Sequence, residues 1–364
     1  MKPTLPRPRG ALSNALLDRL RIGQPIPTDL RAPPNSGPTD PLTDDDLHLA
    51  LWCCYELHYH GFDQVDERLE WDPAILAFRA EMESSFEGAL RAEHQAAAVP
   101  ADPALALRVI ADWAGPPLAS TVEADGARWQ LAELAVHRSI YQLKEADPHT
   151  WVIPRLTGPA RSALIEIQAD EYGGGRPGEA HGELFAAAMA ELGLSPAFGA
   201  YVDEVPGVTL ATDNLVSMFG LNRRLRGALI GHLALFEMCS VVPMTRYLTA
   251  ARRVGGLQAL ERFYRVHIEV DAHHARLALD HMVAHLAEQE PDLAADITFG
   301  AAALSRAEAR FARHVLRTWK EGRSSLRAMP VTSTDDTSAV PASSSDRPRP
   351  RPGAGPAAAD RVLA

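Results

Sequence analysis

Cysteine is scarce in this sequence. The three cysteines are Cys53, Cys54 and Cys239, and two of them are adjacent. An odd number with this spacing excludes a disulfide framework and a Cys-x-x-Cys metal or redox site. Buried, reduced thiols remain as the interpretation, and they are typical of a cytoplasmic protein.

Long apolar runs are also missing. No stretch approaches the roughly 20 consecutive apolar residues that a membrane-spanning helix needs. Near the start, Pro3, Pro6 and Pro8 lie among basic residues and no apolar segment follows them, so no signal peptide is expected. The sequence therefore predicts a protein without a membrane partner.

The chain has too little positive charge for a typical nucleic-acid-binding protein. Its 364 residues include 36 Lys and Arg against 47 Asp and Glu, which gives a net charge of −11. Such a protein gains no general attraction to phosphate backbones through counterion release. Hydrophobic residues make up 46% and charged residues 23%, as in ordinary globular proteins. We therefore expect a folded protein without a nucleic-acid partner.

The alternating pattern of β-strands is absent too. No run alternates apolar and polar residues for long enough to predict a sheet, whereas helical periodicity continues through most of the chain. Asp147-Pro148, Gly255-Gly256 and Glu290-Pro291 mark boundaries between the periodic segments. We predict an all-α fold with helices over residues 44–61, 73–95, 102–113, 126–145, 158–172, 178–193, 195–205, 209–219, 222–252, 255–286, 291–296 and 298–320.

Composition divides the chain into three parts. Residues 1–45 are rich in Pro and Asp and form an N-terminal arm, with one short amphipathic piece around Ala11 to Ile22. Residues 46–322 form the helical domain. Residues 323–364 are rich in Ser, Pro, Arg, Ala and Gly. This tail cannot bury enough apolar surface to offset its ordering entropy, so it is predicted to be disordered.

The most informative segment runs from Val266 to Ala275. Within it, His267, Asp271 and His274 lie at positions i, i+4 and i+7, which places them within about 60° of one another on one helix face. Imidazole and carboxylate groups arranged in this way suit iron, manganese or zinc. The alternative is a solvated helix face that carries two histidines and an acid.

A buried metal needs further ligands from facing helices. Glu237 lies among apolar residues in the middle of a predicted long helix. An isolated buried carboxylate there must be paired, protonated or metal-bound. The alternative to a metal is a salt bridge to Arg223 or Arg246.

Glycines 173–175 separate two more candidate ligands. Three consecutive glycines permit an abrupt break in the chain, so Glu171 at the end of one helix and His181 at the start of the next can face the same point. A flexible surface turn is the alternative. Glu145 lies beside another predicted helix end, where it could instead pair with Lys144 or cap the helix.

These candidates supply enough ligands for two metal ions bridged by carboxylates. Ferritin-like di-iron bundles use paired Glu-x-x-His motifs, and no such motif occurs in this sequence, which disfavours that architecture. The other histidines considered are expected to be packing, capping or surface residues: His58, His60, His149, His232, His273 and His281.

The order Glu-x9-His, a lone helical Glu and His-x3-Asp-x2-His resembles the haem-oxygenase-like di-iron oxidase and oxygenase superfamily, often labelled iron-containing redox enzymes. Residues 53–59, 141–149 and 170–175 also resemble its actinobacterial members, and the resemblance spans about residues 45–320. It implies a haem-oxygenase-like helical bundle. It also implies that Glu145 is the extra carboxylate of N-oxygenating members, and that the metal ligands are Glu171, His181, Glu237, His267, Asp271 and His274.

The resemblance also implies a function. Members load two Fe(II) ions, take O2 as a co-substrate and oxidise small organic substrates, by N-oxygenation or by oxidative C–C cleavage of an amine, amino acid or fatty acid. Manganese stays open as the metal because it takes the same ligands. An electron donor and a homodimer stay open as partners. The alternative is a non-catalytic helical metal-binding or scaffold protein, with a vestigial or storage metal site.

Overall fold

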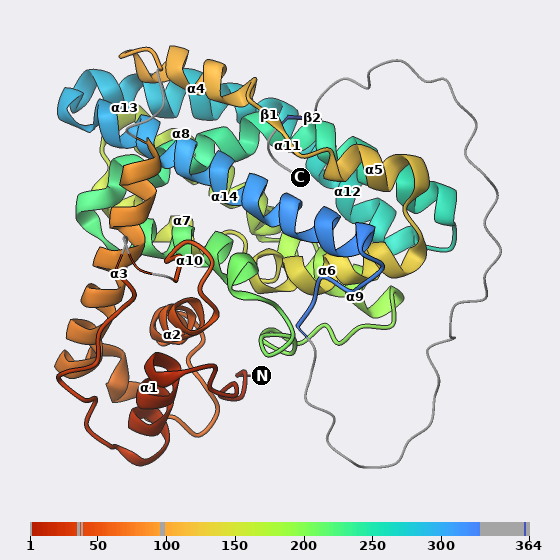
Figure 1. Cartoon of the computed structure of the whole chain (residues 1–364). Coiled ribbons are helices and arrows are strands. Elements are labelled where there is room, and N and C mark those ends of the chain that lie inside the picture. Colours follow the sequence, from red (N-terminus) through yellow and green to blue (C-terminus); the bar gives the residue numbers. More distant parts are fainter. Residues whose placement is uncertain (1, 35–36, 38, 95–98, 328–359, 362–364) are drawn as a thin grey trace, which may run out of the picture.

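The computed structural model describes residues 2–34, 37, 39–94, 99–327 and 360–361. They form an all-helical bundle, with the N-terminal helices gathered at one end (Figure 1), and the predicted all-α class is confirmed. The α-helices are α1 Ala11–Ile22, α2 Asp45–Glu56, α3 Pro73–His94, α4 Pro103–Ala111, α5 Leu118–Asp125, α6 Arg128–Gln142, α7 Asp147–Thr150, α8 Gly158–Glu171, α9 His181–Glu191, α10 Gly207–Leu221, α11 Arg226–Val254, α12 Gln258–Arg276, α13 Ala284–Gln289 and α14 Ala294–Lys320.

Shorter elements connect these helices. A π-helical turn over Leu277–Val283 joins α12 to α13, so this part of the chain is one continuous helical run with a bulge. The two short strands, β1 Ala114–Gly115 and β2 Asp360–Arg361, pair antiparallel. The 3-10 turns are η1 Glu67–Trp71, η2 Ile153–Arg155, η3 Gly173–Gly175, η4 Arg223–Leu225 and η6 Pro291–Leu293.

The helix predictions need correction in several places, and the predicted boundary at residue 297 lies inside the continuous helix α14. Residues 195–205 were predicted to be helical but form a series of turns, because Pro196 lacks a backbone donor and Gly199 adopts a positive φ of 76°. The predicted helix over residues 126–145 ends at Gln142, which leaves Glu145 in a turn. The helix α5 over Leu118–Asp125 was not predicted.

Helix α11 is the centre of the bundle and packs extensively against α12 and α14. It crosses α14 at very short range, because a Cβ on Gly231 would lie 1.8 Å from the carbonyl oxygen of Ile297. A Cβ on Gly300 would likewise lie 1.9 Å from the carbonyl oxygen of Ala228. Glycine at both positions therefore lets the two backbones touch.

Residues 223–254, which include α11, are long and apolar enough by composition to span a membrane, a length that the sequence analysis did not recognise. Of their most apolar window, 72% is buried inside the protein. Burial against other helices is what the core helix of a soluble bundle shows. We therefore interpret α11 as a core helix.

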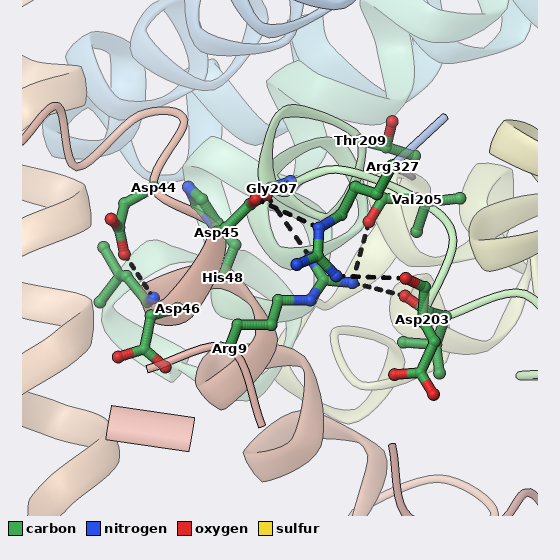
Figure 2. Close-up of polar contacts among 12 residues, drawn as sticks. Arg9, Asp44, Asp45, Asp46, His48, Asp203, Val205, Gly207, Thr209 and Arg327 are labelled. Carbon is green, nitrogen blue, oxygen red and sulfur yellow. Dashed lines mark hydrogen bonds and ion pairs between the residues drawn. The ribbon is translucent and has the colours of Figure 1, made fainter. Parts of the chain in front are cut away.

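The N-terminal arm packs on the body through Arg9. Its Nη2 donates hydrogen bonds to the carbonyl oxygens of Val202 and Val205, and its Nη1 lies 3.6 Å from Asp45. Figure 2 shows this guanidinium between Asp45 on one side and Val205 and Asp203 on the other. The arm thereby holds the turn segment that precedes α10.

The ordered body extends five residues beyond the predicted boundary at residue 322. Ser325 is buried, and its backbone N–H donates to Glu133 over 2.6 Å while its Oγ lies 2.9 Å from His137 Nε2. Arg327 lies 3.3 Å from Asp45 and appears beside Arg9 in Figure 2. These polar contacts hold residues 323–327 on the body, although the segment has few apolar side chains to bury. Apart from β2, the rest of the predicted tail lies outside the described residues.

The close contact between α11 and α14 leads to a stability prediction. The substitution Gly231→Ala should lower the free energy of unfolding by about 2 kcal/mol, because the added methyl group forces two packed backbones apart. Chemical denaturation followed by circular dichroism measures this change. As a control, Ala77→Ser on the exposed face of α3 should change stability by less than about 0.5 kcal/mol. Equal denaturation midpoints for Gly231→Ala and the unmodified protein would contradict the packing described here.

Candidate metal centre

The structure brings all seven sequence-predicted ligands together in the interior. Each is buried, and they come from five segments of the chain. Carboxylates and imidazoles gathered in an apolar core require a compensating partner. The segments are the turn after α6 with Glu145, the end of α8 with Glu171, the start of α9 with His181, the middle of α11 with Glu237, and α12 with His267, Asp271 and His274.

One group of three consists of Glu145, His181 and His267. Their ligand atoms lie within 4.8 Å of one another. His267 Nε2 is 3.3 Å from Glu145 Oε2, and His181 Nδ1 is 4.0 Å from the same oxygen. Two imidazoles and a carboxylate converging at these distances form a cradle for one metal ion.

The second group consists of Glu171, Asp271 and His274, whose ligand atoms also lie within 4.8 Å of one another. Glu237 completes this side, with its Oε2 3.5 Å from His274 Nδ1. Glu171 reaches both groups, because its Oε1 is 3.8 Å from His274 Nδ1 and its Oε2 is 2.7 Å from His181 Nδ1. Glu171 is therefore placed where a bridging carboxylate would be.

The glycine turn between α8 and α9 explains how Glu171 and His181 meet. Glycines 173–175 have φ values of 72°, 60° and 74°, which strain any residue with a Cβ. A Cβ on Gly173 would lie 2.5 Å from the backbone nitrogen of Ala180, so the chain doubles back closely on itself. As predicted, α8 ends at Glu171 and α9 begins at His181.

The start of α9 also packs against the turn that carries Glu145. A Cβ on Gly182 would lie 3.0 Å from the carbonyl oxygen of Leu143. On the other side of this turn, Gln168 Nε2 donates a 2.9 Å hydrogen bond to the carbonyl oxygen of Ala146. These two contacts set the distance between Glu145 and His181.

Outer contacts orient His267 and His274, the two histidines of α12 that are candidate ligands. His267 Nδ1 donates to the carbonyl oxygen of Phe263 over 2.9 Å, which leaves the lone pair of Nε2 facing Glu145. His274 Nε2 lies 3.1 Å from Asp170 Oδ2, which turns Nδ1 toward Glu171 and Glu237. A carboxylate on the outer nitrogen raises the basicity of an imidazole as a metal ligand.

Sequence reasoning missed two residues of this outer layer. Asp170 begins the segment 170–175 that resembles the family but received no role, and Ser240, which hydrogen-bonds Asp271, was not considered. Asp170 is adjacent to Glu171, and Ser240 lies three residues after Glu237, less than one helical turn away. Their closeness in sequence to Glu171 and Glu237 is the signal that could have identified Asp170 and Ser240.

Burial and repulsion between neighbouring carboxylates raise the pKa values of two of the candidate ligands, Glu237 and Asp271. Burial raises the pKa of Glu237 to about 7, with Glu171 adding to the effect. Burial and the nearby Glu237 raise the pKa of Asp271 to about 8. Both carboxyl groups are thus held partly or mainly protonated at neutral pH unless a cation is present.

The pKa values of two histidines are raised, although burial by itself would lower them. Burial disfavours the imidazolium of His267, but the carboxylates of Glu145, Asp271 and Glu171 outweigh it and raise its pKa to about 10. For His274, burial is likewise outweighed, mainly by Glu237, and its pKa rises to about 9. Protons therefore take the place that metal cations would take among these carboxylates.

The structure does not support the alternative roles that the sequence left open for Glu237, Glu145 and the histidine-bearing face of α12. Glu237 faces His274, whereas Arg246 lies 3.8 Å from Glu123. Lys144 does not pair with Glu145. Its Nζ is buried 3.1 Å from Asp213 and 3.5 Å from Glu56. The solvated-face alternative fails for α12, because His267, Asp271 and His274 are all buried. The neighbouring His273 is exposed instead and lies 3.0 Å from Glu166.

Two cavities reach the cluster. The larger, of about 370 Å³, has Glu145, Glu171 and His181 in its wall together with Tyr172 and Phe198. The smaller, of about 10 Å³, lies deeper among the candidate ligands. Its wall is formed by Tyr141, Glu145, His149, Glu171, Leu233, Phe236, Glu237, His267 and Asp271.

The residues present fit a pair of first-row transition metal ions. Glu171 Oε2, His181 Nδ1 and His274 Nδ1 are buried and make no well-directed hydrogen bond to any described residue, although Glu171 and His181 lie only 2.7 Å apart. Two ligand atoms whose lone pairs point at the same cation are expected to lie close together without forming a well-directed hydrogen bond to each other. Mixed carboxylate and imidazole ligands suit iron and manganese.

Comparison with known proteins agrees with this site. Residues 132–309, which contain all seven candidate ligands, match the family model described as iron-containing redox enzyme. The chain is also 28% identical over 150 residues to nitrosourea synthase of Streptomyces achromogenes subsp. streptozoticus. That alignment covers 41% of this chain and 32% of the relative, so the chain matches about a third of the relative's length. The resemblance inferred from the sequence is confirmed.

The shifted pKa values predict that metal binding releases protons. His267 and His274, with pKa values of about 10 and 9, must lose their protons to bind a metal. Anaerobic titration with Fe(II) at pH 7 should therefore release about two or more protons per chain. Calorimetry in buffers of different ionisation enthalpy counts them. Apparent affinity should fall as the pH is lowered from 9 to 6, and a pH-independent affinity would contradict this assignment.

Proposed function

From the match of residues 132–309 to the family model described as iron-containing redox enzyme, we propose that the protein is a non-haem di-iron oxidase or oxygenase. In this proposal it uses O2 to oxidise a small organic substrate. The observation that carries the proposal is the pair of buried ligand groups, one around Glu145 and one around His274, joined through Glu171. A structural metal site would need only one such group.

The charge of the site matches two divalent cations. Glu145, Glu171, Glu237 and Asp271 carry four negative charges when ionised, and two divalent cations carry four positive charges. A buried cluster is tolerated when its charges cancel and its lone pairs are used. Three neutral imidazoles then complete the ligand set without adding charge.

Two iron ions held by these residues would supply the electrons that reduce O2 and the oxidising power for the substrate. The chain's own part is to hold the seven ligands and to limit the access of water. Leu233 and Phe236 from α11 and Tyr141 from α6 form the apolar side of the small inner cavity. Exclusion of bulk water strengthens the electrostatic interactions inside such a site.

The larger cavity is the proposed substrate site. Its volume of about 370 Å³ lies in the range of small-molecule pockets. Phe198 and Tyr172 offer apolar surface in its wall, while Glu145, Glu171 and His181 form the part nearest the ligand cluster. A substrate held there would lie beside three of the residues proposed to hold the metal ions.

Nitrogen oxidation is the favoured reaction type. Glu145 lies within the ligand cluster, where the family resemblance assigns the extra carboxylate of N-oxygenating members. The relative named nitrosourea synthase makes, by its name, a product with an oxidised nitrogen. Oxidative C–C cleavage of an amine, amino acid or fatty acid is the second reaction type, and both stay within O2-dependent oxidation. An electron donor and a homodimeric state remain predictions.

Metal content and O2 consumption test this proposal together. The purified protein, reconstituted anaerobically with Fe(II), should bind two irons per chain. On mixing with O2 in a stopped-flow spectrometer it should give a transient visible absorbance and consume O2. Slow oxidation without a two-iron stoichiometry would indicate metal storage. The absence of stoichiometric iron would indicate a vestigial site, and either result contradicts the proposal.

A pair of adjacent histidines provides a matched variant and control. His274→Ala should lose about one iron per chain and abolish O2 consumption, because it removes a buried ligand, while far-ultraviolet circular dichroism stays helical. His273→Ala, one residue away but exposed, should keep both irons and the wild-type rate. If His274→Ala retained two irons per chain, the ligand assignment would be wrong.

A further inference from the structure

His149, which the sequence predicted to be a packing, capping or surface residue, is a buried residue of the inner cavity. It lies on α7 and is 2% exposed. Its side chain lines the cavity of about 10 Å³ beside Glu145, Glu171 and Glu237. Its Nε2 has no hydrogen-bond partner among the described residues. A buried polar atom without a protein partner is unfavourable. Because the side chain that carries it lines the cavity, this atom points to an occupant of that cavity.

The orientation of the ring defines what that occupant can be. The imidazole hydrogen-bonds the backbone of Glu145, and because Nε2 is unpartnered, this bond uses Nδ1. A backbone carbonyl only accepts hydrogen bonds, so Nδ1 carries the proton and Nε2 presents a lone pair. The unpartnered nitrogen of His149 is therefore an acceptor.

His149 is not placed as a metal ligand. It lies outside both groups of ligand atoms within 4.8 Å of one another. Unlike Glu237, which lies 3.5 Å from His274, it forms no ion pair with a member of either group among the described residues. The volume of about 10 Å³ corresponds to the smallest space that holds one water-sized molecule. Such a molecule would also have carboxylates within the same wall as polar partners, as a buried water requires.

We propose that His149 is a positioning residue of the metal centre, whose Nε2 accepts a hydrogen bond from a water molecule held in the inner cavity. This inference rests on the proposed function for its role, whereas the water can be observed in the metal-free protein. The water lies between His149 and the carboxylates around Glu171 and orders the polar side of the cavity. His149 thereby sets the hydrogen bonding next to the place where O2 reacts.

A neighbouring histidine serves as the control. His232 on α11 is also buried, its Nδ1 also lacks a partner among the described residues, and its ring centroid lies 5.9 Å from that of His149. It does not belong to the wall of the inner cavity. The two residues thus share burial and chemistry and differ in access to the cavity.

A crystal structure of the metal-free full-length protein at high resolution tests the water directly. Ordered density at hydrogen-bond distance from His149 Nε2 is expected, and its absence overturns the proposal. In a crystal structure of the His149→Leu variant, this density should be absent from the inner cavity. Because no iron is present, this result is independent of whether the protein binds two irons.

Kinetics of iron oxidation test the positioning role. After anaerobic loading with Fe(II), His149→Leu should keep two irons per chain but react with O2 about tenfold more slowly or worse. His149→Gln, which can present a carbonyl oxygen as acceptor, should recover most of the rate. His232→Leu should react within about twofold of the unmodified protein.

Other outcomes of these experiments would overturn either the positioning role of His149 or the proposed function. Loss of iron in His149→Leu would make His149 a ligand and overturn the positioning role. Equal rates for His149→Leu and the unmodified protein, or equally slow rates for the Leu and Gln variants, would also overturn it. If the unmodified protein binds no iron, the proposed function fails, while the metal-free crystal structure still decides whether His149 holds water.

Discussion

The burial of four carboxylates and three histidines in one helical core is the constraint on which the rest of the structure depends. Without cations, this cluster is held by protonation, since burial raises the pKa of Glu237 and Asp271, and carboxylates raise the pKa of His267 and His274. Such a cluster is costly unless its charges cancel. The helices around it must therefore be packed tightly enough to hold seven polar side chains at fixed distances.

Two features of the fold meet this requirement. Gly231 lets α11 touch α14 backbone to backbone, so that the helix carrying Glu237 has little freedom to move. Behind the turn that carries Glu145, the buried Lys144 ammonium lies between Glu56 and Asp213 and over the ring of Tyr59 at 4.3 Å. Breaking a buried ion pair of this kind leaves an uncompensated charge, so this network anchors the turn next to the ligand cluster.

The sequence predicted the all-α class and most helices because periodicity and glycine or proline boundaries are local signals. It failed at residues 195–205, where Pro196 and Gly199 outweigh an otherwise helical composition. It also placed the end of the ordered body too early. Ser325 is held by Glu133 and His137, residues far away in sequence, and no local pattern reports such contacts.

Within the site, the sequence by itself determined the residue types and their local phase. His267, Asp271 and His274 share a face because the helix repeat requires it, and the glycines at 173–175 permit the reversal between Glu171 and His181. Only the tertiary structure decided that Glu145 and Glu237 join them, that Asp170 orients His274, and that His149 faces the inner cavity. The physical reason is that these relations depend on distances between separate helices, which are set by packing across the whole core.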